Sequence, residues 1–146
     1  MESPSLPRDA FEATVVRVID GDTLVASRNG KRVRVRLIGI DAPESVQPDA
    51  PVECFGRESA SRLRELLPAR TAVRASFQGH QHEDRFGREL WDVWLRDSGF
   101  LQGELVRGGY VRARGYPPHT RYAETLAAEE QVARAAGLGL HGRCQT

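Results

Sequence analysis

Residues 11–37 alternate apolar and polar side chains with a period of two, which is typical of strands that bury one face. The pattern predicts one strand over 11–19 and a second over 24–27, separated by the turn signal Asp20-Gly21-Asp22. Asn29-Gly30 follows, and this dipeptide is the strongest short signal for a hairpin. The beginning of the chain therefore predicts a meander of strands.

The third predicted strand has two faces of opposite character. Its apolar face is formed by Val33, Val35 and Leu37, and its other face by Arg32, Arg34 and Arg36. Because successive side chains of a strand point to opposite sides, one face packs and the other carries positive charge.

The rest of the chain mixes helical and strand-like patterns. Residues 42–53 hold three prolines and predict a loop. The following elements are expected in order: a helix over 55–67 ended by Pro68, strands over 71–77 and 90–95, a short helix over 100–107, and a last helix over 120–136 with Thr120 as N-cap and Gly137 at its end. This order predicts an α+β fold in which the strands are compatible with a small OB-like barrel.

The length of 146 residues suits one domain, which we place at residues 11–146 after a flexible N-terminal segment, residues 1–10. The net charge is only +1, and Lys31 is the only lysine, so binding of nucleic acid by bulk charge is not expected. No apolar run approaches the roughly 18 residues of a membrane helix, and no signal peptide is recognised in this chain. Any nucleic-acid function must come from a local site.

The two cysteines, Cys54 and Cys144, are too few for a disulfide framework and lack zinc-site spacing. They are either buried thiols or one bridge between the C-terminus and the loop before the first helix. A bridge would favour a secreted or periplasmic location, which the sequence otherwise leaves unknown.

Two aspartates are candidates for a metal site. Asp22 stands at the start of one predicted strand, and Asp41 is expected where the third strand ends. Carboxylates at one end of a sheet repel each other unless a cation lies between them. Oxygen ligands, with the backbone carbonyl of Ala42 as a third, favour calcium, magnesium or manganese. The alternative interpretation is two solvated loop acids.

Three more charged residues suit phosphodiester chemistry. Glu44 follows the rigid Pro43 and could act on a water molecule as general base. Arg36 and Arg88 could flank a phosphate and stabilise the charge that develops on it. The alternative interpretation of each, taken singly, is an ordinary surface residue.

The joint occurrence of these segments identifies a resemblance to the staphylococcal (thermonuclease-like) nuclease family over residues 13–142. The matching strings are residues 19–23 (IDGDT), 36–44 (RLIGIDAPE), 53–56 (ECFG), 84–88 (DRFGR) and 105–108 (LVRG). The resemblance implies a five-stranded OB-fold barrel with three helices. We expect a monomer with no membrane association.

The resemblance implies a calcium-dependent nuclease that cuts DNA and RNA with little sequence specificity and leaves 3′-phosphate products. Asp22, Asp41 and the Ala42 carbonyl would bind one calcium ion. Glu44 would act through the attacking water, and Arg36 and Arg88 would bind the phosphate. The substrate would be single-stranded or locally melted.

The chain departs from the family at several positions. Phe86 replaces a tyrosine that contacts a terminal phosphate, while Arg85 keeps positive charge beside it, so both are candidate substrate-binding residues. The loop over 45–53 lacks lysine and contains Asp49, Gly115 falls near a nucleotide-stacking tyrosine, and His141 replaces a tryptophan. The competing hypothesis is a non-catalytic OB-fold module that binds single-stranded nucleic acid or a protein tail.

Other aromatic residues allow plainer interpretations. Trp91 and Trp94 are expected on opposite faces of one strand, where one is core and the other could be a base-stacking surface. The histidines in polar loops are expected to be solvated: His80, His82 and His119.

Overall fold

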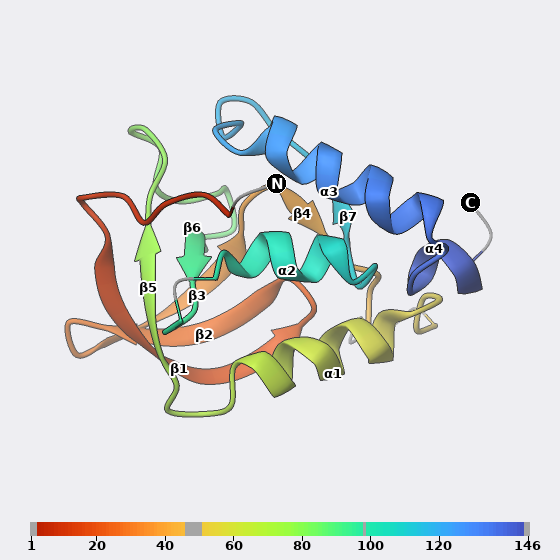
Figure 1. Cartoon of the computed structure of the whole chain (residues 1–146). Coiled ribbons are helices and arrows are strands. Elements are labelled where there is room, and N and C mark those ends of the chain that lie inside the picture. The colour runs from red at the N-terminus through yellow and green to blue at the C-terminus, as the bar shows by residue number, and fades with distance from the viewer. Residues whose placement is uncertain (1–2, 46–50, 98, 145–146) are drawn as a thin grey trace.

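The computed structural model describes residues 3–45, 51–97 and 99–144, and its centre is a closed five-stranded barrel (Figure 1). The strands are β1 (Phe11–Asp20), β2 (Thr23–Arg28), β3 (Lys31–Leu37), β5 (Ala72–Ser76) and β6 (Glu89–Trp94). They follow one another around the barrel in the order β1-β2-β3-β6-β5, and β1 and β5 close it. The β3–β6 pair is parallel and the other pairs are antiparallel. The predicted α+β fold with an OB-fold barrel is confirmed.

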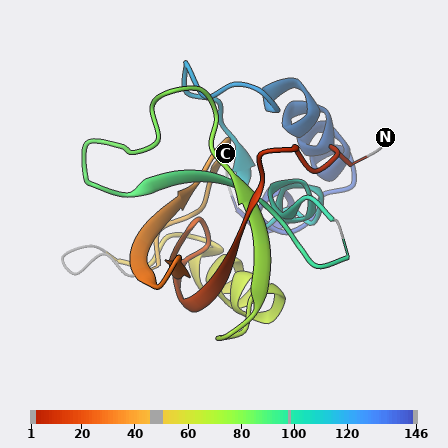
Figure 2. The same ribbon diagram turned by 90° about the vertical axis from the view of Figure 1, so that its left-hand side faces the viewer.

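Helices gather at one side of this barrel, behind the strands in the view of Figure 2. They are α1 (Gly56–Leu66), α2 (Leu101–Arg107), α3 (Ala123–Ala135) and α4 (Leu140–Arg143). A second, two-stranded sheet pairs β4 (Ile40–Asp41) with β7 (Arg112–Ala113). The three expected helices are present, and within the described residues the four-residue α4 and the small sheet are additions to the prediction. No helix of the described residues is both long and apolar enough to cross a membrane.

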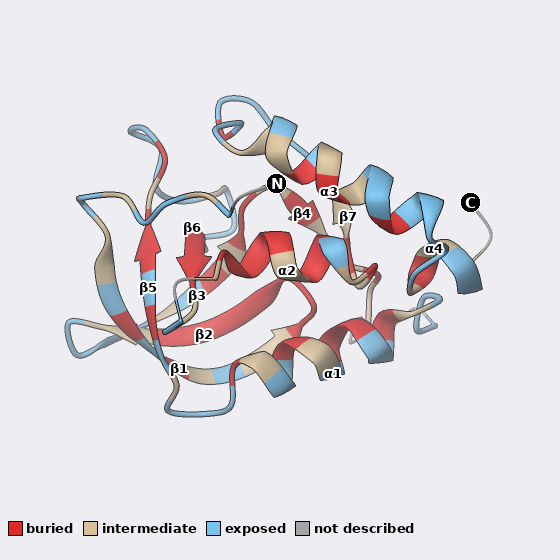
Figure 3. Cartoon of the chain, viewed as in Figure 1, coloured by how far each residue is buried: buried red, intermediate tan, exposed pale blue. Residues whose placement is uncertain are grey.

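The barrel encloses the apolar core, which Figure 3 shows as buried segments along β2, β6 and α2. Val35 and Leu37 of β3 are fully buried, as the alternation predicts. The register of β1 against β2 shifts between Val15 and Arg17 and again between Val18 and Asp20. Such bulges bend a strand and redirect its side chains. After the second shift, Asp20 is paired with Thr23 at the end of the barrel.

Both tryptophans of β6 are buried, so the suggestion that one forms a base-stacking surface is wrong. Trp91 is 0% exposed and packs edge-on against Phe11. Trp94 is 1% exposed, because Phe100 at the start of α2 lies 5.2 Å from it, ring centroid to centroid, and the N-terminal segment also covers it. Tertiary packing on both faces of β6 makes both side chains core residues.

The segment before β1 contacts the end of β6 and the start of α2. The indole Nε1 of Trp94 donates to the carbonyl oxygen of Pro4 at 3.0 Å. The backbone N–H of Phe100 donates to the hydroxyl of Ser3 at 3.1 Å. Of the segment 1–10 expected to be flexible, residues 1 and 2 lie outside the described residues.

Two element boundaries differ from the predictions. Strand β3 ends at Leu37, so Asp41 does not end the third strand but lies in β4, paired with Arg112. The N-cap of α3 is Tyr122 rather than Thr120, whose carbonyl oxygen instead accepts a turn hydrogen bond from Ala123. The C-terminal end of α3 is as predicted, since Gly137 has a positive φ of 63°.

Of the predicted loop over 42–53, residues 46–50, Asp49 among them, lie outside the described part of the chain.

Candidate active site

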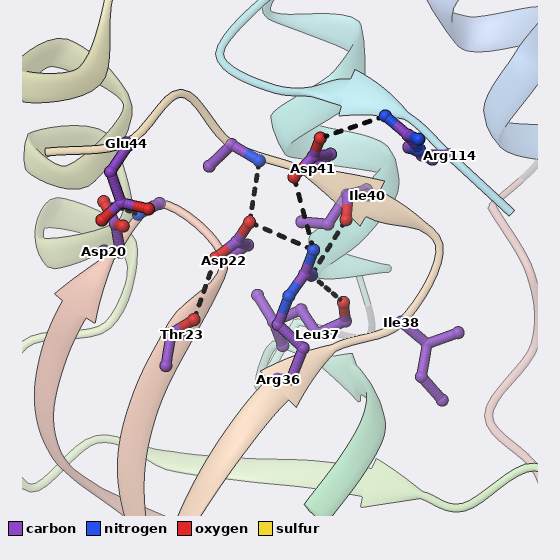
Figure 4. Close-up of polar contacts among 12 residues, drawn as sticks. Asp20, Asp22, Thr23, Arg36, Leu37, Ile38, Ile40, Asp41, Glu44 and Arg114 are labelled. Atoms are coloured by element: carbon purple, nitrogen blue, oxygen red, sulfur yellow. Dashed lines mark hydrogen bonds and ion pairs between the residues drawn. The ribbon is translucent and has the colours of Figure 1, made fainter. Parts of the chain in front are cut away.

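Arg36 holds two aspartates together at one end of the barrel, Asp22 from the turn before β2 and Asp41 from β4 (Figure 4). Its Nη2 lies 3.3 Å from Oδ2 of Asp22 and 3.5 Å from Oδ1 of Asp41. Its Nη1 donates to the carbonyl oxygens of Leu37 at 2.7 Å and Ile40 at 2.9 Å. The backbone turn between β3 and β4 therefore fixes the guanidinium in one orientation.

Asp22 is the most firmly held carboxylate of the site. Its Oδ1 accepts from the hydroxyl of Thr23 at 2.9 Å, and its Oδ2 accepts from the N–H of Ala42 at 2.8 Å. The side chain thus ties the start of β2 to the end of β4. It is buried, with 7% of the residue exposed, and keeps its orientation through these bonds.

Asp41 stands across from Asp22 and is half-buried. Burial raises the pKa of Asp41 above its ordinary value, the Arg36 guanidinium opposes this, and the Asp22 carboxylate raises the pKa further. Arg114 lies 3.7 Å from its Oδ2. Two carboxylates whose charges disfavour one another form a region where an additional cation is electrostatically favoured.

The donor chemistry fits a hard divalent cation. Asp22, Asp41 and the Ala42 carbonyl supply oxygen atoms only, which calcium and magnesium prefer. Among the described residues, no group of three or more His, Cys, Asp or Glu side chains is placed to hold a metal ion. The candidate set contains only two such side chains, so a bound cation would complete its coordination with water or substrate oxygen.

The segment after β4 carries Glu44 to the same place. The N–H of Glu53 donates to the carbonyl oxygen of Glu44 at 2.9 Å, and Oε1 of Glu53 accepts from the N–H of Glu44 at 2.7 Å. The hydroxyl of Ser45 donates to Oδ1 of Asp20. Glu44 and Asp20 thereby lie at one wall of the site, on the far side of Asp22 from Arg36 in Figure 4.

Two glycines let α1 approach these loops closely. A Cβ at Gly56 would stand 2.5 Å from the carbonyl oxygen of Glu44. A Cβ at Gly21, between Asp20 and Asp22, would stand 2.0 Å from Oγ of Ser59 on α1. The start of α1 therefore acts as a support beneath both the aspartate turn and the Glu44 segment.

Arg88 is positioned by a turn that it closes itself. Asp84 accepts three hydrogen bonds: from the N–H of Phe86 at 2.9 Å, from the N–H of Arg88 at 3.0 Å and from its Nε at 2.8 Å. Burial alone would raise the pKa of Asp84, but these bonds and the positive charge of Arg88 outweigh it and lower the pKa. Asp84 therefore stays ionised and holds the guanidinium.

All the predicted catalytic and metal-binding residues line one cleft of about 240 Å³. Its walls are formed by Ile19, Asp20, Asp22, Thr23, Arg34, Arg36, Asp41, Ala42, Glu44 and Arg88. The sequence predicted six of these as site residues but assigned no role to Asp20 or Arg34. The available signal for Asp20 was its position two residues before Asp22 in the same turn.

A second groove of about 480 Å³ adjoins the cleft and shares Arg36 and Arg88 with it. Phe86 is 60% exposed on its wall, with the guanidinium of Arg85 4.9 Å from the ring centroid. Tyr116 is 50% exposed and also lines the groove, and Arg114 lies 5.3 Å from its ring. Sequence reasoning missed Tyr116, for which the only signal was an isolated aromatic residue in a proline-rich turn.

The loop histidines differ from one another. His80 and His82 are exposed, as expected. His119 is only 7% exposed, and its Nε2 donates to the carbonyl oxygen of Gln81 at 2.7 Å, so the prediction that it is solvated is wrong. Its ring joins two loops that line the larger groove.

Cys54 and Cys144 form a disulfide in the structure, with an S–S distance of 2.04 Å. The bridge joins the residue after Glu53 to the end of α4. Of the two arrangements that the sequence left open, the structure has the bridge.

Comparison with known proteins gives a consistent result. A family model described as "Staphylococcal nuclease homologue" matches residues 34–142. The chain is 37% identical over 120 residues to the thermonuclease of Staphylococcus hyicus, covering 82% of this chain and 69% of the relative. It is 36% identical over 129 residues to the thermonuclease of Staphylococcus intermedius, covering 88% and 75%. Endonuclease YncB of Bacillus subtilis (strain 168) is 32% identical over 128 residues, which cover 87% of this chain and 60% of the relative.

Proposed function

Because the chain belongs to the staphylococcal nuclease homologue family, we propose that it is a calcium-dependent nuclease that hydrolyses DNA and RNA with little sequence specificity. The products would carry 3′-phosphates. The observation that carries the proposal is the convergence of two aspartates, two arginines and a glutamate on one cleft, from four separate parts of the chain.

Asp22, Asp41 and the backbone carbonyl of Ala42 would hold the calcium ion. When bound, the ion would supply Lewis acidity toward a phosphate oxygen and a template for substrate. Asp22 brings to this role a carboxylate already fixed by Thr23 and the Ala42 N–H. Asp41 brings a second carboxylate held by Arg36 and Arg114.

Glu44 would accept the proton of the attacking water or orient that water. A general base must be held where the water can reach both it and the phosphorus atom. The buried Pro43 and the paired backbone of Glu44 and Glu53 hold the main chain of the segment in place.

Arg36 and Arg88 would bind the phosphate and stabilise its added negative charge. Each guanidinium is oriented by partners other than the substrate: Arg36 by two carbonyl oxygens, and Arg88 by Asp84. Donors that are oriented in advance need no reorganisation as charge develops, which is the main source of electrostatic catalysis.

The larger groove would receive the nucleotide beside the scissile phosphate. Phe86 offers a ring on which a base can stack, and Arg85 adds positive charge for the backbone. Stacking needs an unpaired base, so the substrate would be single-stranded or locally melted. The protein would act as a monomer, without a membrane.

Substitution of the cleft residues tests the proposal. Arg36→Ala and Arg88→Ala should each lower kcat by about 10²- to 10³-fold, and Glu44→Gln by about 10²- to 10⁴-fold. Circular dichroism and thermal melting should show an unchanged fold. Arg64→Ala, an exposed arginine of α1, is the matched control and should retain the wild-type rate.

The alternative, a non-catalytic OB-fold module, predicts a different outcome. The wild-type protein would then bind single-stranded nucleic acid in chelator as well as in calcium and release no nucleotides. Wild-type rates in all three cleft variants would also refute the assignment of these residues.

The disulfide supports a secreted or periplasmic location, because such bonds persist mainly in oxidising compartments. Protein isolated from its native host under denaturing conditions that block thiol exchange should contain no free thiol. Two free thiols in that preparation would argue against this location.

A further inference from the structure

Three arginines form one face on the outside of the barrel, next to the cleft. This arginine face consists of Arg17 of β1 and of Arg32 and Arg34 of β3. The β-sheet register places Arg17, Val25 and Arg34 in one row across β1, β2 and β3. On the same face of the sheet, the next row toward the active site contains Asp20, Thr23 and Arg36, and the next row away from it contains Thr14, Ser27 and Arg32.

The arginine face is exposed, and its charge is not compensated by ion pairs within the described part of the chain. Arg17, Arg32 and Arg34 are all exposed, and no ion pair to any of them is found among residues 3–45, 51–97 and 99–144. Glu12, the next outward acid along β1, is already 3.5 Å from Arg74. Because the net charge of the chain is only +1, this cluster is a local feature and not a consequence of general basicity.

The arginine face is continuous with the cleft. Arg34 belongs to both, since it lines the cleft together with Asp22 and Glu44. In Figure 4 the strands that carry Thr23 and Arg36 extend away from the cleft. By the register of these two strands, the pairs Val25–Arg34 and then Ser27–Arg32 lie farther along them. The larger groove with Phe86 opens from the cleft past Arg36 and Arg88, and it is not lined by Arg34. The cleft therefore continues on one side into the groove with Phe86 and on the other side into the arginine face.

The spacing of the arginines on the arginine face suits a chain of phosphates. Arg32 and Arg34 are two residues apart on one strand, about 6.6 Å, and Arg17 and Arg34 are two strands apart, about 9.6 Å. Arginine binds phosphate in a bidentate manner and without regard to base sequence. A positively charged surface that follows the backbone is how OB folds hold single strands.

We propose that the arginine face binds the backbone phosphates of the nucleic-acid strand on the side of the scissile phosphate opposite the aromatic groove. The proposal rests on the nuclease function proposed above and deepens it. It makes the substrate a polynucleotide several nucleotides long, held on both sides of the cleft, rather than a single nucleotide and its phosphates.

Direct binding tests this arrangement. The Glu44→Gln protein, in which cleavage should be about 10²- to 10⁴-fold slower, is titrated with fluorescein-labelled single-stranded DNA at several salt concentrations. Adding Arg17→Ala and Arg32→Ala should weaken binding of a strand of about 20 nucleotides roughly tenfold and reduce the salt slope by about 1.4, or 0.7 for each lost phosphate contact. A strand of about 4 nucleotides, enough only for the cleft and groove, should bind with less than a twofold change.

The matched control removes the same charge elsewhere. Arg64 and Arg96 are exposed arginines outside this face, and no ion pair to them is found among the described residues. The proposal predicts that Arg64→Ala with Arg96→Ala leaves the long strand bound as before. An equal loss in both double variants, or no loss in either, would overturn it. Cleavage by the wild-type protein is measured separately. If the wild-type protein does not cut, but long-strand binding is weakened by Arg17→Ala with Arg32→Ala and not by the control pair, the nuclease proposal is refuted and the binding role of the arginine face stands.

Discussion

Glu44 and Glu53 are joined by two hydrogen bonds, one from the Glu53 N–H to the Glu44 carbonyl at 2.9 Å and one from the Glu44 N–H to Oε1 of Glu53 at 2.7 Å. Cys54 follows Glu53 directly and is bridged to Cys144, 90 positions later in the chain. A short series of covalent and hydrogen bonds therefore links the C-terminal helix to the residue that we propose acts on water.

Loss of this bridge should affect both stability and rate. Cys54→Ser combined with Cys144→Ser should lower the free energy of unfolding by about 2–4 kcal/mol, as measured by urea titration. The value of kcat should also fall several-fold at a temperature where the variant is folded, because the Glu44 segment loses its covalent anchor. Reduction of the wild-type disulfide should reproduce the loss, and reoxidation should reverse it. A variant that is less stable but cuts at the wild-type rate would show that the bridge only stabilises the fold.

Gly56 should be required for activity through its contact with Glu44. A methyl group in Gly56→Ala would meet the Glu44 carbonyl oxygen at 2.5 Å, so one of the two segments must move. We expect kcat to fall by about 10- to 100-fold, since small displacements of a catalytic group have effects of this size. Gly103→Ala is the control, because its methyl group would find ordinary contact distances of 3.4 Å or more within α2. Equal rates for the two variants would contradict this role of Gly56.

The barrel could be predicted from the sequence because each strand carries its own period-two pattern, as in Val33, Val35 and Leu37. The position of Asp41 could not, because β4 and β7 are two residues long and exist only through pairing of Ile40 and Asp41 with Ala113 and Arg112 far along the chain. The burial of Trp94 depends likewise on Phe100 and on the N-terminal segment. Local periodicity contains no information about such long-range contacts.

The site residues were predictable to a different extent. Asp22, Arg36 and Glu44 stand in short strings whose joint order indicated their roles. Asp20 lies within the string 19–23 but was given no role, and Arg34 and Tyr116 stand in none of these strings; only the folded arrangement places the three residues on the walls of the cleft and the groove.

Asp84 should act as a positioning residue for Arg88. Asp84→Ala removes the acceptor of the Arg88 Nε and of two backbone N–H groups, so the guanidinium loses its fixed orientation. We expect kcat to fall by about 10- to 100-fold, with a smaller fall for Asp84→Asn, which keeps one acceptor oxygen. Glu83→Gln, at the exposed neighbouring position, should leave the rate unchanged. A wild-type kcat in Asp84→Ala would show that Arg88 is oriented without it.

Asp92 should make stability depend on pH. Burial raises its pKa from 3.8 to about 7, although the Gln78 side chain and Arg121 oppose the shift. Between these two pH values the folded protein keeps a proton that the unfolded chain has released. The free energy of unfolding should therefore fall as pH rises through this range, by up to roughly 1.4 kcal/mol per pH unit.

The variant Asp92→Asn cannot ionise, and its side-chain oxygen can still accept from Nε2 of Gln78, as Asp92 does at 2.8 Å. Its stability should change less between pH 5 and pH 8, and above pH 7 it should exceed that of the wild type by about 1–4 kcal/mol. Urea titrations at each pH measure this, with the exposed Glu65→Gln as control. Parallel pH profiles for Asp92→Asn and the wild type would rule out Asp92 as the source.

Digestion of single-stranded DNA and of RNA by the pure protein, in calcium, in magnesium and in chelator, decides whether the cleft is that of a calcium-dependent nuclease. We expect release of acid-soluble fragments with 3′-phosphate ends in calcium, no release in chelator, and loss of activity in Asp22→Ala and Asp41→Ala proteins that remain folded. Cutting that continues undiminished in chelator would contradict the assigned role of the two aspartates. The absence of cutting in every metal, with single strands still bound, would identify the protein as a binding module instead of a nuclease.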